Sequence, residues 1–382
     1  MSVPDTAVRP VRILAHGYEA PLAEPRRNAF GTMDRRPALF IEMEDASGAV
    51  GWGEVFCNWP VFGWRHRARI VADILAPLAL DREHASPAAM MDALEDETRA
   101  ITIQCDEPGP FAQAIAGLEI AAWNCVAARR NAPLHGVLAP DRTRAPVPAY
   151  ASGLTAGTID RIVPGLVGSG WSGFKLKIGF RNEADLAAVR RLRELAGPDA
   201  ALMVDANQRF DREDAARMAD ALAIGGIAWF EEPIAADAPI EDWIWLAERS
   251  AIPLAGGENV RGMDAFEQLI DGDALAVVQP DIAKWGGLAR AMHIAERAKA
   301  RGVAFAPHYL GGAVGLAATA ELAMATGASW LEVDANPNPL RDKPLTPDFI
   351  HNGRYVASEA TAQFDPTAVA NLLAATSEAD NP

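Results

Sequence analysis

Residues 202–205 read Leu-Met-Val-Asp, a short apolar run that ends in an acid, and residues 229–231 repeat this form as Trp-Phe-Glu. Six further apolar runs occur in the C-terminal two-thirds of the chain, at 147–150, 174–178, 253–255, 277–278, 304–306 and 330–331. Polar side chains lie within or just after most of these runs: Lys175, Lys177, Asp205, Glu231, Glu258, Asp281, His308 and Glu332. Because parallel strands end at a common edge, this series places the function at one rim of a sheet.

Helix-like segments alternate with these runs and indicate a parallel sheet covered by helices. From Lys177 to Glu332, successive polar markers are 23 to 28 residues apart. This regularity predicts an α/β fold in which a (β/α)7β TIM-like barrel occupies residues 141–340 and carries the active site at the C-terminal ends of its strands. A doubly wound open sheet is the alternative, but it would concentrate ligands at a single switch point.

The first 140 residues follow another pattern. Apolar and polar residues alternate between 11 and 55 around the turn Asp45-Ala46-Ser47-Gly48, which predicts an antiparallel meander. Helical spacing follows at 65–75, 88–100 and 111–129. We therefore expect an α+β capping domain over 1–140, a proline-rich linker over 131–148, and residues after about 340 that pack back on the smaller domain.

Composition narrows the class of function. The chain has 382 residues, 50% of them hydrophobic, and a formal net charge of −16, which argues against nucleic acid or an anionic membrane as a partner. No signal-like N-terminus is apparent, and the three cysteines are too few and too scattered for a disulfide framework. We expect a cytoplasmic protein that acts on a small molecule and, by the general tendency of such proteins, forms a homo-oligomer.

Three carboxylates predict a metal site. Asp205, Glu231 and Glu258 follow three consecutive strands of the expected barrel. Oxygen-only ligation favours a hard cation, and Mg²⁺ binds a few carboxylates while leaving positions open for water and substrate oxygens.

Two lysines suggest a base. Lys175 and Lys177 alternate with apolar residues, so on a strand both side chains point to the same face. If that face is the barrel interior, the two ammonium groups lie near each other and near the metal, each favours the neutral form of the other, and one lysine can act as a base near neutral pH. A solvated strand edge is the alternative.

His308 and Asp281 suggest a second acid/base group. An aspartate that accepts from one imidazole nitrogen orients the ring and leaves the other nitrogen free to move a proton. Glu332, on the last strand, donates a hydrogen bond to a substrate oxygen if it is held protonated. A structural salt bridge is the alternative for Glu332.

The ordered motifs Lys-x-Lys, Asp-x-Asn, Glu-Glu-Pro, Gly-Glu-Asn, Gln-Pro-Asp-x-x-Lys-x-Gly-Gly, Pro-His and Trp-Leu-Glu resemble the enolase superfamily, specifically its mandelate racemase subgroup. Val50-Gly51-Trp52-Gly53-Glu54 also resembles that family's N-terminal capping domain. The resemblance implies Mg²⁺-dependent abstraction of the proton α to a carboxylate, giving a metal-stabilised enediolate. It also implies residue roles: Asp205, Glu231 and Glu258 as ligands, Lys177 as a base tuned by Lys175, His308 with Asp281 as the other base, Glu332 as the electrophilic acid, and Asn207 and Lys284 in the substrate pocket.

The family does not settle the reaction. Acid-sugar dehydratase, a lyase, is the leading interpretation, because His308 can protonate a departing β-hydroxyl. Similarity at 29–36, 256–258 and 338–341 to lactone cycloisomerases of the family keeps that reaction open, as it does racemisation or epimerisation. A Schiff-base aldolase with Lys177 as nucleophile and a non-catalytic binder are alternatives of other classes. Arg26 is expected to hold a distal carboxylate of the substrate.

Overall fold

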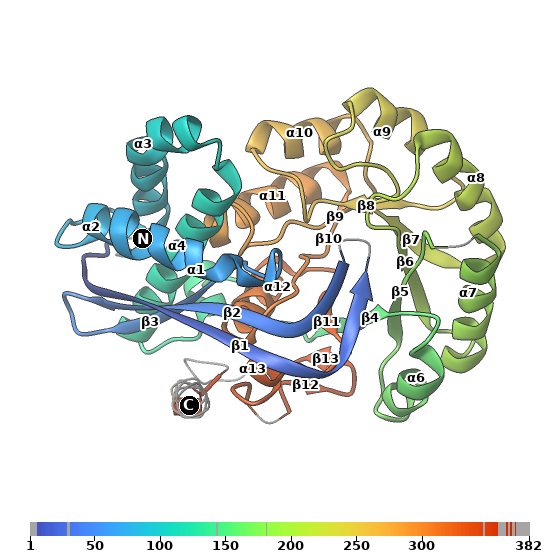
Figure 1. The fold of residues 1–382 in the computed structure, drawn as a ribbon, viewed down its shortest axis with the longest axis horizontal. Helices are drawn as coiled ribbons and strands as arrows, with labels where there is room; N and C mark the ends of the chain where they lie inside the picture. Colours follow the sequence, from blue (N-terminus) through green and yellow to red (C-terminus); the bar gives the residue numbers. More distant parts are fainter. Residues whose placement is uncertain are drawn as a thin grey trace.

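The computed structural model describes residues 6–357 apart from 29–30, 143, 181 and 347, together with residues 364, 365, 367, 368 and 371. The chain forms a barrel with a smaller α+β domain beside it (Figure 1). The predicted fold class, an α/β barrel with an N-terminal capping domain, is confirmed.

Eight parallel strands form the barrel, and each matches one of the predicted apolar runs: β4 (Val147–Leu154), β5 (Gly173–Lys177), β6 (Ala201–Asp205), β7 (Ile227–Glu231), β8 (Leu254–Gly256), β9 (Val277–Val278), β10 (Ala304–Phe305) and β11 (Leu331–Asp334). From β4 to β10 each strand pairs with the next, and β11 pairs with β4. The ring closes where the amide of Ser329 donates to the carbonyl of Phe305 at 2.9 Å.

Seven helices connect these strands and cover the barrel, which gives the (β/α)7β order: α6 (Ile159–Gly168), α7 (Asn182–Ala196), α8 (Arg212–Leu222), α9 (Ile240–Ala247), α10 (Met263–Asp271), α11 (Gly287–Arg301) and α12 (Ala313–Thr326). A 3₁₀ turn, Ala223–Gly225, extends α8.

The barrel interior has an apolar layer below a charged rim. Tyr150, Met203, Trp229, Ala255, Val277 and Ala306, one residue from each of six strands or strand ends, form a buried cluster. Above it, Lys177 is the register partner of Asp205, and Asp205 is the register partner of Glu231. The strand register therefore places three charged groups at one level of the rim.

The capping domain is a three-stranded antiparallel sheet of β1 (Pro10–Asn28), β2 (Gly31–Asp45) and β3 (Val50–Val55), packed against helices. The helices are α1 (Trp64–Arg69), α2 (Ala76–Ala79), α3 (Pro87–Cys105) and α4 (Pro108–Arg129), with a 3₁₀ turn at Val61–Gly63 and a π-helical turn at Ile70–Leu75. Gly53 permits close packing, because a Cβ there would lie 2.0 Å from the carbonyl oxygen of Gly117 in α4. Among the described helices, α4 alone has the length and apolarity to cross a membrane, but 72% of its apolar window is buried, as in a core helix.

Two buried carboxylates of the capping domain cap helices of the barrel. Glu54 of β3 accepts from the amides of Gly312, at 2.5 Å, and Gly315, at 2.8 Å, at the start of α12. Glu119 of α4 accepts from the amides of Leu288, at 2.8 Å, and Ala289, at 3.0 Å, at the start of α11. The N-cap residue of both helices is a glycine, which has no side chain to accept from the first amides of the helix. The two carboxylates therefore pair with amides that would otherwise lack an acceptor.

The predicted linker is partly a packed helix. Helix α5 (Leu134–Leu138) lies within 131–148, and both the amide and Nδ1 of His135 lie 2.8 Å from Glu321 in α12. This segment is therefore packed against the barrel. The prolines predicted a linker but gave no sign of this packing.

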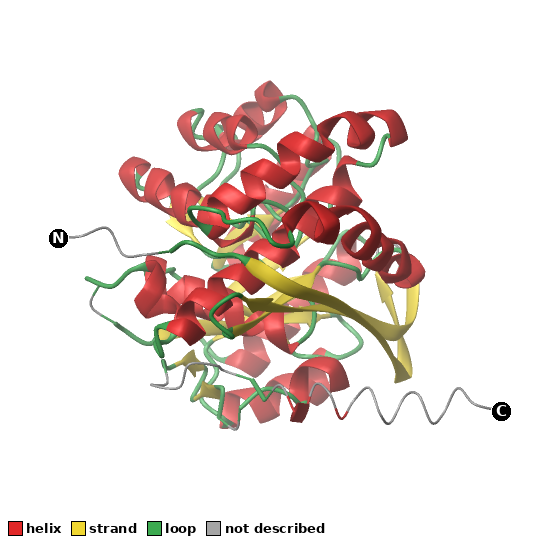
Figure 2. Cartoon of the chain, turned by 90° about the vertical axis from the view of Figure 1, so that its left-hand side faces the viewer, coloured by secondary structure: helices red, strands yellow, loops and turns green. Residues whose placement is uncertain are grey.

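Residues after 340 contact both domains. Helix α13 (Pro339–Asp342) contacts β1 and β2, while β12 (Ile350–His351) and β13 (Arg354–Tyr355) form a hairpin that extends from β4. The long β1–β2 ribbon projects beyond the capping helices towards the barrel (Figures 1 and 2). These contacts place capping-domain residues over the C-terminal rim.

Candidate active site

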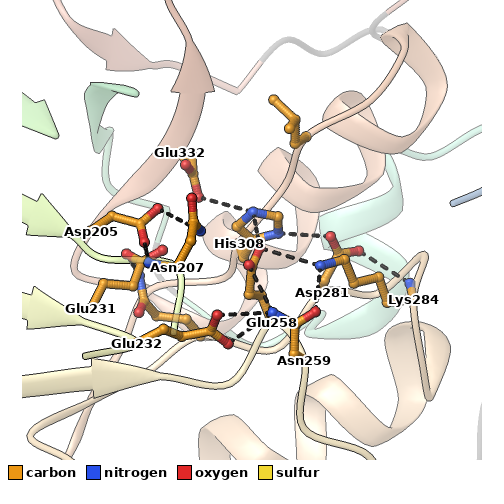
Figure 3. A network of polar contacts seen from close by, with 12 residues as sticks. Asp205, Asn207, Glu231, Glu232, Glu258, Asn259, Asp281, Lys284, His308 and Glu332 are labelled. Carbon is orange, nitrogen blue, oxygen red and sulfur yellow. Dashed lines mark hydrogen bonds and ion pairs between the residues drawn. The ribbon is translucent and has the colours of Figure 1, made fainter. Parts of the chain in front are cut away.

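The polar side chains predicted at successive strand ends meet at the C-terminal rim of the barrel (Figure 3). They form one connected network of acids, amides and cations.

Lys175 is a buried cation between two acids. Its Nζ lies 2.6 Å from Glu231 Oε1 and 2.8 Å from Glu332 Oε1. Burial acts to lower the pKa of Lys175, but the two carboxylates outweigh it and raise the pKa well above its ordinary value. Lys175 therefore remains an ammonium group that neutralises neighbouring charge.

Lys177 is the lysine that reaches open space. Its side chain is 21% exposed, against 2% for Lys175, and its Nζ donates to Asp205 Oδ2 at 2.9 Å and to Asn207 Oδ1 at 2.6 Å. Burial lowers the pKa of Lys177 and Lys175 lowers it further, as expected from the sequence, but Asp205 and Glu258 together outweigh them and the pKa is raised. The role of Lys177 as a base near a metal ion therefore stays a prediction.

His308 lies between two acids. Its Nδ1 is 2.7 Å from Asp281 Oδ2, so the predicted His–Asp pair is present, and its Nε2 is 2.5 Å from Glu258 Oε2. Asp281 is held in turn, because its Oδ1 accepts from the amide of Ala283 at 2.9 Å. Burial acts to lower the pKa of His308, but Glu258 and the other neighbouring carboxylates raise it to about 10.

Glu332 forms the salt bridge that the sequence left as the alternative. It accepts from Tyr150 Oη at 3.0 Å and lies 3.8 Å from Nε2 of His308, in addition to its contact with Lys175. Burial acts to raise the pKa of Glu332, but Lys175 and His308 outweigh it and the pKa is lowered. The salt bridge is therefore present, and the role of Glu332 as a hydrogen-bond donor, which needs a protonated carboxyl group, stays a prediction.

The three predicted metal ligands, Asp205, Glu231 and Glu258, lie on or just after neighbouring strands. No group of three acid, histidine or cysteine side chains among the described residues is arranged as a complete metal-binding set, because each of these acids is turned towards a protein cation. Their donor chemistry nevertheless fits Mg²⁺, which prefers oxygen ligands. Burial and neighbouring acids raise the pKa of Glu231 to about 7 despite Lys175, so a divalent cation would relieve the crowding of negative charge.

Three further residues complete the network, and the sequence reasoning gave them no role. Glu232 is buried, has a φ of 39°, and accepts from Asn259 Nδ2 at 2.9 Å. Asn259 also donates to Glu258, and Gln279 donates to Glu231 Oε2 at 2.8 Å. Each of the three lies in a quoted motif, Glu-Glu-Pro, Gly-Glu-Asn or Gln-Pro-Asp, but the motif alone does not say which neighbour an amide orients.

A cavity of about 470 Å³ opens beside this network. Lys177, Asp205, His308 and Glu332 line it together with a second group of residues, Arg36, Ser152, Asp334 and Asn336. Both domains contribute to its walls, because Met33 and Arg36 come from β2. The capping domain therefore covers part of the cavity above the charged rim.

Two predicted pocket residues lie outside this lining, and a third is not described. Asn207 contacts Lys177 and Asp205 without lining the cavity. Lys284 is likewise displaced from the cavity and lies 3.3 Å from Glu258 and over the ring of Phe56. The side chain of Arg26 lies outside the described part of the structure, so its role stays a prediction.

Comparison with known families places this geometry in context. The model of the mandelate racemase/muconate lactonizing enzyme N-terminal domain matches residues 11–139, and the model described as enolase C-terminal domain-like matches residues 162–361.

Two curated relatives match most of the chain. It is 30% identical to D-galactarolactone cycloisomerase of Agrobacterium fabrum over 361 residues, which cover 91% of this chain and 88% of that protein. It is 28% identical to arabinonate dehydratase of Saccharolobus solfataricus, with coverage of 86% of this chain and 91% of that protein.

Solved structures agree with the fold. A mandelate racemase/muconate lactonizing enzyme from Bordetella bronchiseptica RB50 matches with a TM-score of 0.88 and 39% identity, over 96% of this chain and 99% of that one. An enolase from Bradyrhizobium, complexed with magnesium and mandelic acid, matches with a TM-score of 0.82 and 26% identity, over 97% of this chain and 99% of that one.

Proposed function

Because the chain belongs to the mandelate racemase/muconate lactonizing enzyme family of the enolase superfamily, we propose that it is a Mg²⁺-dependent acid-sugar dehydratase, a lyase that removes the proton α to a carboxylate and then eliminates water. The observation that carries this proposal is the cavity, which is lined by Lys177 and His308 together with Asp205 and Glu332. A small carboxylate that enters this space meets two groups able to move protons.

Asp205, Glu231 and Glu258 are the residues that would hold Mg²⁺. When bound there, the ion supplies positive charge that binds the substrate carboxylate and stabilises the charge developing on it. Binding requires the three acids to exchange their present cationic partners for the metal. Loss of its contact with Asp205 and the nearby positive charge would both lower the pKa of Lys177, so that the ammonium group could release its proton and the neutral amine could act as a base.

The side chains support a two-step proton movement. In the first step, Lys177 or His308 removes the α-proton, and the electron pair of the C–H bond moves towards the carboxylate. In the second step, the bond between the β-carbon and its hydroxyl breaks, and His308 donates a proton through Nε2 so that water leaves. The enol that remains becomes a 2-keto-3-deoxy acid by taking up a proton at carbon. Asp281 lies 2.7 Å from Nδ1 of His308 and so fixes the orientation of the ring, which leaves Nε2 on the opposite side to donate the proton.

A lactone cycloisomerase is the second candidate, and the relative that carries that name is the observation that favours it. The same α-proton removal would expel a ring ester oxygen in place of a β-hydroxyl. The two reactions use the same residues of this chain and differ in the leaving group.

Proton NMR in D₂O tests the proposal. The purified protein is incubated with Mg²⁺ and a panel of aldonates, aldarates and their lactones, and both α-proton exchange and new products are followed. A 2-keto-3-deoxy acid formed from an open-chain acid supports the dehydratase, and product formed only from lactones supports the cycloisomerase. Inversion without net loss of substrate indicates an epimerase. An adduct trapped on Lys177 by borohydride would contradict the proposal in favour of a Schiff-base aldolase.

A further inference from the structure

One segment of the capping domain, residues 54–58, contacts both barrel loops that carry the His308–Asp281 pair. It includes the end of β3 and the residues just after that strand. Every second residue of the segment makes a hydrogen bond to the barrel: Glu54, Phe56 and Asn58. Residues two apart in an extended chain lie on the same side, so the segment presents one row of contacts to the barrel.

The loop after His308 is held at two points. Asn58 Nδ2 donates to the carbonyl of Leu310 at 2.5 Å, and Glu54 Oε1 accepts from the amide of Gly312 at 2.5 Å. Leu310 and Gly312 lie two and four positions after His308. Glu54 and Asn58 are only 2% and 3% exposed, so water cannot readily replace either bond if it is lost.

Tyr309, which directly follows His308, packs beside the same carboxylate. A Cβ on Gly311 would lie 2.3 Å from Tyr309 Oη and 2.9 Å from Glu54 Oε1, and a Cβ on Gly315 would lie 2.2 Å from Tyr309 Oη. Burial, and then the charge of Glu54, raise the pKa of Tyr309 well above its ordinary value, so the ring remains an uncharged phenol. The two glycines leave room for this ring, which ties the residue next to His308 to Glu54.

The loop of Asp281 is bonded to the same segment. The amide of Phe56 donates to the carbonyl of Ala283 at 3.3 Å, and the amide of Ala283 donates to Asp281 Oδ1 at 2.9 Å. The ammonium group of Lys284 lies over the ring of Phe56, 4.7 Å from its centre. Ala283 therefore joins the capping domain to the carboxylate that orients His308.

We propose that residues 54–58 are a positioning element for the His308–Asp281 pair, and that Glu54 and Asn58 hold its His308 side. The 2.7 Å contact between Nδ1 and Oδ2 joins loops that follow different strands, so it depends on how the two loops are placed relative to each other. Neither Glu54 nor Asn58 is among the residues that line the cavity, so both act through His308 and not on a bound acid. The consequence for proton transfer rests on the proposed function.

The test follows the proton on Nδ1 of His308 by proton NMR of the whole protein without substrate. A proton held between an imidazole nitrogen and a carboxylate resonates far downfield, and its absence from Asp281→Ala assigns the signal. We expect Glu54→Gln and Asn58→Leu each to lose this signal, because the proton exchanges with water once ring and carboxylate are misaligned. Both replacements are close in size to the original side chain, so packing changes little.

Glu321→Gln is the matched control. Glu321 is also a buried carboxylate that accepts from a backbone amide, that of His135 at 2.8 Å, and it lies in α12, but it faces α5 and not the loop after His308. We expect this variant to lose stability and keep the signal. Urea unfolding shows which variants are folded, and Asn58→Leu keeps the test decisive if Glu54→Gln does not fold.

An unchanged signal in the folded variants of Glu54 and Asn58 would overturn the proposal. Loss of the signal in Glu321→Gln as complete as in Glu54→Gln would also overturn it, because general loosening of α12 would then explain the effect. Absence of the signal from the wild type would do the same, since no fixed pair would exist.

Where turnover occurs, we expect kcat of Glu54→Gln and Asn58→Leu to fall at least about tenfold with KM little changed, because the binding cavity is intact. The NMR signal needs no substrate. A signal that depends on Glu54 and Asn58 in a protein that converts no sugar acid would therefore support the positioning element and contradict the dehydratase.

Discussion

Lys175 and Lys177 lie two residues apart on one strand and have opposite surroundings. Lys175 is fully enclosed by Glu231 and Glu332, whereas Lys177 lines the cavity. Sequence alternation predicted that both lysines would face inward, but it could not show which carboxylate each one contacts. The acids that they contact lie between 28 residues (Lys177 to Asp205) and 157 residues (Lys175 to Glu332) further along the chain. The structure therefore separates an enclosed cation from a lysine that reaches the cavity.

This difference gives the first prediction. Lys175→Met leaves two buried carboxylates without their cation, so we expect the free energy of unfolding to fall by about 3–5 kcal/mol. Lys177→Met should lower stability much less but reduce turnover at least 100-fold, because it removes an acid/base group. Urea unfolding and turnover of the same two variants check this. Equal loss of stability in both variants would contradict the assignment.

Glu258 supports a second prediction at this scale. We expect Glu258→Ala to weaken Mg²⁺ binding more than tenfold in a calorimetric titration, because it removes one of the three proposed oxygen ligands. Lys284→Ala is the control: Lys284 lies 3.3 Å from Glu258 and competes with a metal for it, so its loss should leave Mg²⁺ affinity equal or higher. Unchanged affinity in Glu258→Ala would remove Glu258 from the ligand set.

At the scale of elements, the strands were predictable and the caps of two helices were not. Short apolar runs between helical segments mark barrel strands, because a buried parallel strand needs side chains that are apolar on both faces. The caps of α11 and α12 come from Glu119 and Glu54, which are 169 and 258 residues before the amides they bind. The sequence signals for the start of a helix lie in and just before its first turn. In α11 and α12 the N-cap residues are glycines, so the sequence near these helices does not show what caps them.

The third prediction concerns this capping contact. Gly287 has a φ of 57°, and a Cβ there would lie 2.3 Å from Glu119 Oε2. Gly302, at the other end of α11, has a φ of 72° and no atom within 4 Å of such a Cβ. We expect Gly302→Ala to lower the free energy of unfolding by about 1–2 kcal/mol, the cost of a left-handed backbone, and Gly287→Ala to lower it by at least about 1 kcal/mol more because the carboxylate must move. Urea unfolding checks the difference, and equal losses would show that the carboxylate contact is unimportant.

At the scale of the whole molecule, sequence periodicity predicted two domains but not how they are joined. The segment 131–148 reads as a linker because of its prolines, yet α5 within it binds Glu321 through His135. Similarly, the acids of the rim were found as a set, whereas the contact between Arg36 and Asp334 joins residues that are 298 positions apart. Contacts between domains follow from three-dimensional packing and leave no local period in the sequence.

The fourth prediction uses Glu119, which joins the domains. Burial raises the pKa of Glu119 from 4.5 to about 7, although the amides of Leu288 and Ala289 act to lower it. The folded state therefore holds the proton more tightly than the unfolded state. This contribution to stability is fully present below pH 4.5 and is lost as the pH rises to about 7.

We therefore expect the free energy of unfolding of the wild type, relative to Glu119→Gln, to fall by up to about 3 kcal/mol as the pH rises from 4.5 through about 7, and to level off by about pH 8. The amide cannot titrate, so any constant difference between the two proteins reflects altered hydrogen bonds with α11 and not protonation. Urea unfolding of both proteins at half-unit intervals of pH measures the change. A difference that does not vary with pH would mean that Glu119 is ionised in the folded protein throughout this range, held so by the amides of α11.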